Sequence, residues 1–340
     1  MKTLQTLNKK KTNSPPIWIM RQAGRYLKEF KNVKKETGGF IKMVYNPKIA
    51  SKITLQPIKK FGFDSAIIFS DILVIPDSLG QKLTYKDKEG PKLEPMEIEK
   101  MIKILKIEKD KEKLKRTYEA IKKTKQKINN KKTSLIGFVG APLTISFFML
   151  DSLKEKKYKK ILLKMKRKKK QFNKLIKILE TAIIRHALKQ IKAGAQIIQI
   201  FDTWACAANK NELQEYSIKP IKRICANIKK NAPKIPIIVF PRKVKGNYTK
   251  YISPYVDCIS VAEDITQKEI NEIQKKKIIQ GNLSPQTLVK GGQKLEIETK
   301  KVFKRFSKGP FIFNLSHGIL PKTPVENVKK LIKLVRSYKK

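Results

Sequence analysis

The sequence predicts a single-domain α/β protein, a (β/α)8 barrel of the TIM type. Three observations favour this fold. Seven short apolar runs recur along the 340 residues, helix-period stretches separate them, and polar residues directly follow several of the runs. Repeated strand–helix units in a chain of this length are typical of such a barrel. A doubly wound open sheet is the second choice, but no GxGxxG motif follows the first run to support its dinucleotide-binding form.

The predicted strands are rich in β-branched and aromatic residues and show almost no alternation of apolar and polar positions. This pattern is expected of strands that are buried on both faces of a parallel sheet. The strands cover residues 65–71, 134–140, 196–202, 235–241, 258–262, 277–282 and 310–316. The stretch "IWIM" at 17–20 would add one more short extended piece.

Two helices are clear from the pattern. Asn46–Gly62 has a proline near its start and a glycine at its end, as helices commonly do. Leu153–Ala193 repeats Ile, Leu and Met every three or four residues, with Lys on the other face. The uncharged run Ser134–Leu150 is slightly short for a membrane span and contains a proline and two glycines. We therefore expect it to form a buried strand followed by a loop.

The ends of the chain and its composition suggest one domain in a reducing compartment. Residues 1–14 lack the apolar core of a signal peptide, and we expect them to form a flexible N-terminal tail. No linker rich in Pro, Gly or Ser divides the chain. The three cysteines, Cys206, Cys225 and Cys258, have neither CxxC spacing nor a nearby His. We interpret them as reduced thiols of a cytoplasmic protein and expect neither disulfides nor a metal site.

The formal net charge of +50 comes from 69 lysines and only nine arginines, against 28 acidic residues. Such a charge suggests nucleic-acid binding. However, basic runs such as 164–170 fall on the outer faces of amphipathic helices, with few of the aromatic residues that stack on bases. We expect no nucleic-acid partner, and a basic nucleic-acid-binding barrel is kept as an alternative.

Four of the predicted strands end in polar residues: Asp71, Asp202–Thr203, Asn282 and Ser316–His317. The carboxyl ends of barrel strands converge on one mouth, where the active sites of this fold lie. We therefore expect a functional site there.

Arg21 and Arg25 stand out in a chain that otherwise uses Lys. Their i, i+4 spacing would place both guanidinium groups on one face of a helix, where two forks can hold two carboxylates. Gln22 would add an amide at the rim, and Gly24 would let a ligand approach the backbone. A structural pair that bridges to Glu29 or Glu36 is an equally good interpretation of the spacing alone.

Six segments together resemble the uroporphyrinogen decarboxylase family, in the family's order and over almost the whole chain. They are "PPIWIMRQAGRYLKEF" (15–30), "TLQPIKKFGFDSAIIFSDIL" (54–73), "GFVGAPLT" (137–144), "QIFDTWA" (199–205), "QGNL" (280–283) and "FNLSHGILPKTP" (313–324). The resemblance implies a (β/α)8 barrel, a cytoplasmic homodimer without a cofactor, and a role in haem biosynthesis. The implied reaction removes the four acetate carboxyls of uroporphyrinogen III to give coproporphyrinogen III.

The resemblance also implies site residues. The catalytic residues would be Asp71, Arg21 and Arg25, with one of the arginines helping to deliver a proton. The substrate-binding residues would be Arg21, Gln22, Ala23, Gly24, Arg25, Asp71, Phe148, Thr203 and His317. Protonation of a pyrrole carbon makes the substrate its own electron sink, so no cofactor is required. The Asp71 carboxylate would then accept the pyrrole N–H groups and stabilise the cation.

The chain departs from the family pattern at several positions. Phe148 stands where the family usually has a Tyr whose hydroxyl reaches the substrate. Ala262–Glu263 replaces an Asp-Trp pair, and Ser316 replaces a Gly. A catalytically weakened family member is therefore a second alternative. The related cobalamin-dependent methyltransferases carry zinc on a His-x-Cys arrangement, which is missing after His317.

Overall fold

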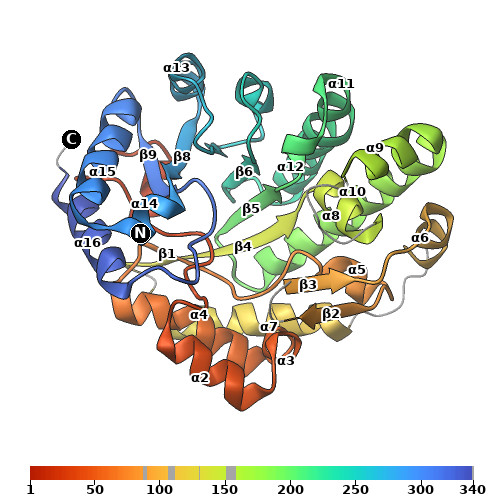
Figure 1. The fold of residues 1–340 in the computed structure, drawn as a ribbon, viewed down its shortest axis with the longest axis horizontal. Coiled ribbons are helices and arrows are strands. Elements are labelled where there is room, and N and C mark those ends of the chain that lie inside the picture. Colours follow the sequence, from red (N-terminus) through yellow and green to blue (C-terminus); the bar gives the residue numbers. More distant parts are fainter. Residues whose placement is uncertain (87–89, 106–111, 130, 151–157, 339–340) are drawn as a thin grey trace.

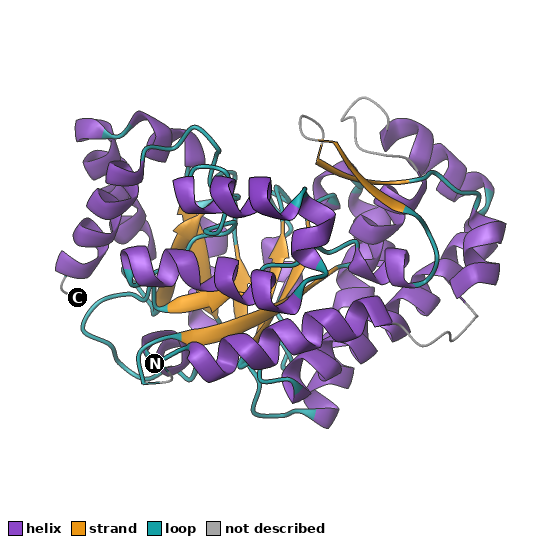
Figure 2. Cartoon of the chain, turned by 90° about the horizontal axis from the view of Figure 1, so that it is seen from below, coloured by secondary structure: helices purple, strands orange, loops and turns teal. Residues whose placement is uncertain are grey.

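The chain forms a barrel of parallel strands surrounded by helices (Figures 1 and 2). A computed structural model describes residues 1–86, 90–105, 112–129, 131–150 and 158–338. The strands are β1 Ser65–Ile67, β2 Leu83–Lys86, β3 Gly90–Leu93, β4 Ser134–Gly140, β5 Ile197–Asp202, β6 Ile237–Pro241, β7 Cys258–Ser260, β8 Ile278–Leu283 and β9 Phe311–Leu315. The helices are α1 Lys2–Leu7, α2 Lys28–Thr37, α3 Phe40–Val44, α4 Pro47–Phe61, α5 Val74–Ser78, α6 Ile98–Leu105, α7 Glu112–Lys127, α8 Pro142–Leu150, α9 Tyr158–Arg167, α10 Lys169–Lys192, α11 Lys210–Leu213, α12 Lys219–Asn231, α13 Gln267–Lys276, α14 Pro285–Lys290, α15 Gly292–Phe306 and α16 Val325–Ser337.

Seven strands form one parallel sheet in the order β1-β4-β5-β6-β7-β8-β9. The extended piece at 17–20 fills the gap between the two edges of this sheet. Ile17 pairs in parallel with Phe313 of β9, and the Ile17 carbonyl accepts a hydrogen bond from Asp64 N–H, next to β1, at 3.0 Å. Each of the seven predicted apolar runs contains one of these strands, which confirms the predicted barrel class.

The barrel interior is a layered apolar core with one polar network. Its buried side chains are Leu7, Trp18, Met20, Ile67, Ile136, Ile197, Ile238, Phe240, Cys258, Ile278 and Ile312. The indole N–H of Trp18 donates to the Gln280 amide oxygen at 3.0 Å. The Gln280 amide nitrogen in turn donates to Gln199 and Ser260, so each of these buried side chains has at least one hydrogen-bond partner. A second, larger core packs the helices on the outer face of the sheet.

The N-terminal segment corrects one expectation. Residues 2–7 form α1 rather than part of a flexible tail. The Leu7 side chain enters the barrel core, and Ser65 donates from β1 to the Thr3 hydroxyl at 2.7 Å. This helix packs at the end of the barrel where the strands begin. The helix is therefore stabilised by tertiary contacts, which cannot be predicted from the sequence pattern of six residues.

The run after β4 corrects a second expectation. Residues 142–150 form α8, not a loop. Eight of its nine residues are buried, so the helix is apolar on all sides and shows no helical period in the sequence. No helix in the described part of the chain is long and apolar enough to cross a membrane.

The two predicted helices are present. In α4, the Asn46 side chain accepts from the N–H groups of Lys48 and Ile49, and Gly62 ends the helix in the left-handed conformation at φ +66°. The predicted helix at 153–193 is divided into α9 and α10, and its first residues, 153–157, lie outside the described residues.

Candidate functional site

Asp71 lies at the carboxyl end of the β1 segment, beside the mouth of the barrel. The backbone up to this residue is fixed by neighbours: Ile68 N–H donates to Ile136 O at 3.0 Å, and Phe69 N–H donates to the Thr54 hydroxyl at 2.9 Å. One carboxylate oxygen, Oδ1, accepts from Leu73 N–H at 2.8 Å. No second hydrogen bond to this carboxylate occurs among the described residues, so it retains acceptor capacity for a ligand.

The surroundings of Asp71 favour a carboxylate that is ionised near neutral pH but poorly hydrated. Burial raises the pKa of Asp71 to about 6, while the Leu73 N–H bond and the positive charge of Arg21 each lower it in part. A perturbed carboxyl beside a specific cation is a frequent feature of functional sites.

Arg21 lies in a turn, and the helix expected from the i, i+4 spacing is absent. Helix α2 begins only at Lys28, and Arg21 itself has a left-handed backbone at φ +61°. This conformation is uncommon for a residue other than glycine and clusters at functional sites. Arg21 and Arg25 are both exposed and lie close enough to interact electrostatically. Turn geometry, rather than a helical face, therefore brings the pair together.

The Arg21 guanidinium is accessible to solvent, yet protein atoms surround it closely. The resulting loss of hydration lowers the pKa of Arg21, Asp71 raises it, and the neighbouring cations Arg242 and Arg25 lower it further. Arg21 is therefore close enough to one carboxylate and two cations to interact electrostatically with each. Its guanidinium can hold an anion with two parallel hydrogen bonds.

Gln22 corrects the expectation of an amide at the rim. Its side chain is fully buried. The amide oxygen accepts from Ile19 N–H at 3.2 Å, and the amide nitrogen donates to Ser65 O at 3.0 Å. Gln22 thus fixes the Arg21 turn to β1 instead of facing a ligand. Ala23 and Gly24 are half-buried in the same turn.

The segment after β9 packs directly on Arg21. A Cβ added to Gly318 would lie 2.4 Å from Cδ of Arg21, which only a shift of that side chain would relieve. Glycine is therefore required here for the close approach. His317 is half-buried beside it, and burial together with Arg21, Arg242 and Lys243 lowers the pKa of His317 to about 3. Its imidazole is neutral at physiological pH and offers one N–H donor and one acceptor.

Thr203 follows β5, in a turn that a buried carboxylate holds in place. Asp202 accepts from the hydroxyls of Thr144 and Ser217, and Thr144 also accepts from Trp204 N–H at 3.0 Å. Burial raises the pKa of Asp202 to about 6, and these hydrogen bonds lower it in part. Thr203 itself is half-buried at this end of the barrel, where its hydroxyl can serve as a ligand donor.

Phe148 lies on α8, partly exposed, with its ring edge-on to Trp204 at 6.5 Å between centroids. It supplies no hydroxyl. Tyr26 does not replace that hydroxyl, because its own OH is buried and donates to Gln22 O at 2.8 Å. Tyr255 is exposed on the connection between β6 and β7.

The remaining departures from the family pattern lie at the same end of the barrel and contact one another. The Ser316 hydroxyl donates to Oε1 of Glu263 at 2.6 Å and so joins the segments after β7 and β9. Asn282 donates to Ala262 O at 2.9 Å. The Asn282 amide nitrogen thus binds the segment after β7, while its amide oxygen has no hydrogen-bond partner among the described residues. Glu263 adds a further carboxylate near the mouth.

Arg242 and Lys243 belong to the site and were not foreseen. They directly follow β6, and their charges act on His317, while Arg242 also acts on Arg21. Lys243 has the left-handed backbone at φ +54°. A signal was present, because Arg242 is one of nine arginines and follows a predicted strand.

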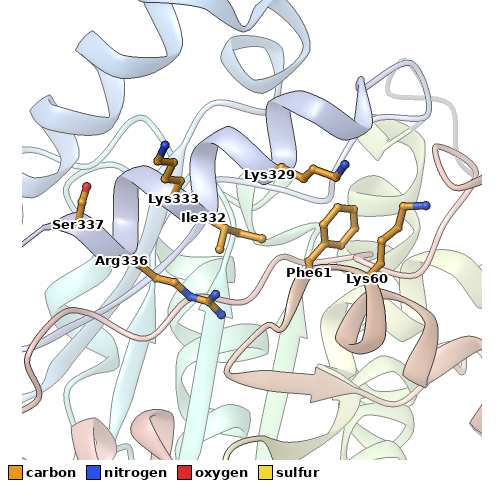
Figure 3. Close-up of a pocket in the computed structure, with 7 residues that line it drawn as sticks. All are labelled: Lys60, Phe61, Lys329, Ile332, Lys333, Arg336 and Ser337. Carbon is orange, nitrogen blue, oxygen red and sulfur yellow. The ribbon is translucent and has the colours of Figure 1, made fainter.

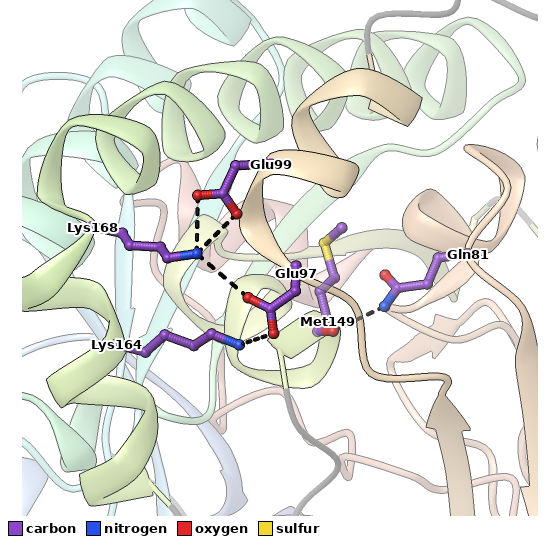
Figure 4. A network of polar contacts seen from close by, with 6 residues as sticks. All are labelled: Gln81, Glu97, Glu99, Met149, Lys164 and Lys168. Atoms are coloured by element: carbon purple, nitrogen blue, oxygen red, sulfur yellow. Dashed lines mark hydrogen bonds and ion pairs between the residues drawn. The ribbon is translucent and has the colours of Figure 1, made fainter.

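One wall beside the mouth is built from the segments that follow β1 and β4 (Figure 4). Gln81 donates to the carbonyls of Glu94 and Met149, which ties this wall to the end of α8. Ion pairs join the start of α6 to α9 and to the residue that follows it. The pairs are Glu97 with Lys164 and Lys168, and Glu99 with Lys168. Such exposed pairs each contribute little, but together they align the two helices.

A surface hollow lies at the other end of the barrel (Figure 3). It is lined by Lys60, Phe61, Lys329, Ile332, Lys333, Arg336 and Ser337. These residues come from α16 and the last turn of α4, which leads into the start of β1. Arg336 donates to Gly62 O at 2.5 Å, and Lys60 pairs with Glu29. The hollow is therefore separate from the candidate site.

The described residues contain no cluster of three or more His, Cys, Asp or Glu side chains that could hold a metal ion. All three cysteines are free, with Cys206 exposed and Cys225 and Cys258 buried.

Comparison with protein-family models matches residues 1–338 to the family described as "Uroporphyrinogen decarboxylase (URO-D)". Proteins named uroporphyrinogen decarboxylase are similar over nearly the full length. The one from Orientia tsutsugamushi (strain Ikeda) is 41% identical over 99% of this chain and 98% of its own. Those from Rickettsia felis and Rhodospirillum rubrum are each 38% identical, over 99% and 98% of this chain and 97% and 96% of their own.

Among solved structures, a methyltransferase from Methanosarcina mazei superposes with a TM-score of 0.79 at 19% identity, over 98% of this chain and 97% of its own. A B12-independent methionine synthase from Shewanella sp. W3-18-1 gives a TM-score of 0.53 at 11% identity, over 85% of this chain and 87% of its own. At these identities the likeness supports the fold alone.

Proposed function

This chain belongs to the uroporphyrinogen decarboxylase family, and from that premise we propose that it converts uroporphyrinogen III to coproporphyrinogen III. The observation that carries the proposal is the proximity of Asp71 and Arg21 at the barrel mouth, where each shifts the pKa of the other. Within the described part of the chain, Asp71 accepts one hydrogen bond and has a cation beside it. A poorly hydrated carboxylate of this kind can stabilise a substrate cation.

The chemistry needs a proton, a fixed negative charge and cations. Protonation of a pyrrole carbon next to the acetate gives a cation on the ring. Asp71 accepts the pyrrole N–H and stabilises that cation. The C–C bond to the carboxyl group then breaks, its electron pair returns to the ring system, and CO2 leaves. The exocyclic carbon takes a second proton and becomes a methyl group, while the first proton is returned.

In this proposal, the side chains around Asp71 bind the carboxylates of the substrate. Arg21 and Arg25 provide two guanidinium forks, and His317 and Thr203 provide neutral donors. An arginine is also assigned to proton delivery. The pKa of Arg21 is lowered mainly by burial, which is the direction that a proton donor requires.

The test is anaerobic incubation with enzymatically generated uroporphyrinogen III, with the eight- to four-carboxyl products separated over time. The wild type should lose the carboxyl groups stepwise, and Asp71→Asn should not. Asp257→Asn is the matched control, because Asp257 directly precedes β7 at the opposite end of the barrel, where it accepts from Ile237 N–H at 2.7 Å. A folded wild type that releases no CO2 would refute the proposal.

We further propose, from the family resemblance, that the enzyme acts in the cytoplasm as a homodimer. Light scattering coupled to size-exclusion chromatography should give twice the 39.3 kDa chain mass. A monomer under assay conditions would contradict the dimer.

A further inference from the structure

The two sides of the barrel mouth carry cations from different strands. Arg21 follows the 17–20 segment, which lies between β9 and β1. Arg242 follows β6, which is flanked by β5 and β7 on the far side of the strand order. A ligand held only by the Arg21 side would leave the β6 side of the mouth without an anion.

The loop that presents Arg242 is fixed at both ends. The Arg242 N–H donates to Asp202 O at 3.1 Å, which continues the pairing of β6 with β5. Lys245 N–H donates to the Asp264 carboxylate at 2.9 Å. Between these two anchors, Lys243 adopts the left-handed backbone that non-glycine residues rarely use. The loop is thus held in one conformation by hydrogen bonds that do not involve the Arg242 side chain.

Arg242 has other cations nearby, because Lys243 is next to it in the chain and Arg21 is within electrostatic range. Its guanidinium is half-buried, and no hydrogen bond or ion pair to it occurs among the described residues. It lies close enough to Arg21 and His317 to act on both electrostatically. Gathering cations in this way is unfavourable unless an anion binds among them. A guanidinium in that setting is suited to a carboxylate, which it can hold with two parallel hydrogen bonds.

We propose that Arg242 is a further substrate-binding residue, which holds a carboxylate of the octacarboxylate substrate on the β6 side of the mouth. The inference rests on the proposed function for the identity of the substrate. Carboxylates are distributed around the rim of the macrocycle, so anchors on two sides restrict its rotation in the mouth. Arg21 and Arg25 alone would fix one edge.

The test compares Arg242→Gln, Arg242→Lys and the control Lys245→Gln. Lys245 lies on the same loop and is exposed, and its hydrogen bond to Asp264 is made by the backbone, so the control removes the same charge without altering the anchor. Two readouts are used. One is KM and kcat for uroporphyrinogen III, and the other is the Kd of uroporphyrin III, the stable oxidised ring with the same eight carboxylates. The Kd is followed by quenching of tryptophan fluorescence, because Trp204 lies next to Thr203 in this site.

We expect Arg242→Gln to raise both KM and Kd about tenfold, with a smaller effect on kcat, since a ground-state carboxylate contact is lost. Arg242→Lys should recover part of the loss, because it restores the charge but not the fork. Lys245→Gln should match the wild type. The inference is overturned if Arg242→Gln binds uroporphyrin III as tightly as the wild type, or if Lys245→Gln weakens binding equally. It is also overturned if the wild type does not bind uroporphyrin III. If the wild type binds without turnover and Arg242→Gln weakens that binding, the inference is supported while the proposed function fails.

Discussion

Asp71 and Asp202 are two carboxylates at the same end of the barrel, and burial raises the pKa of each to about 6. Their hydrogen bonds differ. Asp202 accepts from two hydroxyls, Thr144 and Ser217, and the Ser217 hydroxyl also hydrogen-bonds with that of Tyr251. From the residues that the structure describes, Asp71 accepts one hydrogen bond, from Leu73 N–H. Similar acidity therefore accompanies a structural role in the fully buried Asp202 and an available charge in the half-buried Asp71.

The difference shows that a shifted pKa alone does not identify a catalytic group. What separates the two residues is unused acceptor capacity together with a neighbouring cation, and in this pair Asp71 has both. A buried carboxylate whose oxygens are already occupied stabilises its surroundings instead.

The comparison of Asp71 with Asp202 is tested most directly by substituting Asn for Asp at each of the two positions. Asp71→Asn should reduce decarboxylation by about 10²–10³-fold, because it removes the charge that stabilises the substrate cation. Its stability at pH 8 should be unchanged or higher. The pKa of Asp71 is higher in the folded state than its usual value, so the folded state loses stability as pH rises through about 6 and the carboxylate ionises. The Asn side chain has no such charge and avoids this loss. Single-turnover kinetics and thermal unfolding measure the two effects, and a variant that keeps wild-type activity would remove Asp71 from the mechanism.

Asp202→Asn should show the opposite pattern. Asn retains one acceptor oxygen, so one of the hydroxyls of Thr144 and Ser217 loses its acceptor. We expect the free energy of unfolding to fall by about 1–3 kcal/mol. Urea titration checks this value, with Ser217→Ala as a control that removes one of the two donors. If Asp202→Asn were as stable as the wild type and as inactive as Asp71→Asn, the roles would be reversed.

The sequence predicted the fold well because burial on both faces imposes a simple pattern. Each apolar run coincides with a strand, and the proline near the start of α4 and Gly62 at its end stand where they were expected. Asp71 and His317 follow β1 and β9, at the end of the barrel where the strand ends converge.

The failures share one physical cause, which is tertiary context. Arg21 has helical spacing but a left-handed backbone, because Gln22 fixes its turn to β1. Gln22 is polar but buried, since backbone groups of other segments satisfy its amide. Helix α8 is buried all round and so has no period to detect. Arg242 was missed, although an arginine was informative in a chain with 69 lysines and only nine arginines.

The pH dependence of kcat/KM provides a further test of the difference between Asp71 and Asp202. As pH falls through about 6, Asp71 takes up a proton and loses its charge, so kcat/KM should decrease on the acid side. Arg21 lowers the pKa of Asp71 and has no such effect on Asp202. Arg21→Gln should therefore move this acid limb to higher pH, if Asp71 is the group responsible. His317 has a pKa of about 3, so His317→Gln should leave the limb where it is. A limb that stays fixed in Arg21→Gln would assign the titration to another group.

The smallest expected effect concerns the hydroxyl that the family pattern places near Asp71 and that Phe148 lacks. Phe148 is partly exposed, so a Tyr hydroxyl at this position can reach the ligand or water without being buried unpaired. Phe148→Tyr should raise kcat by up to about tenfold, if the new hydrogen bond acts in the transition state. The neighbouring Phe147 is buried, so Phe147→Tyr is a matched control that should lower stability without raising kcat. An unchanged kcat in Phe148→Tyr would mean that Asp71 works here without that hydroxyl, and that Phe148 is an accommodated difference rather than a defect.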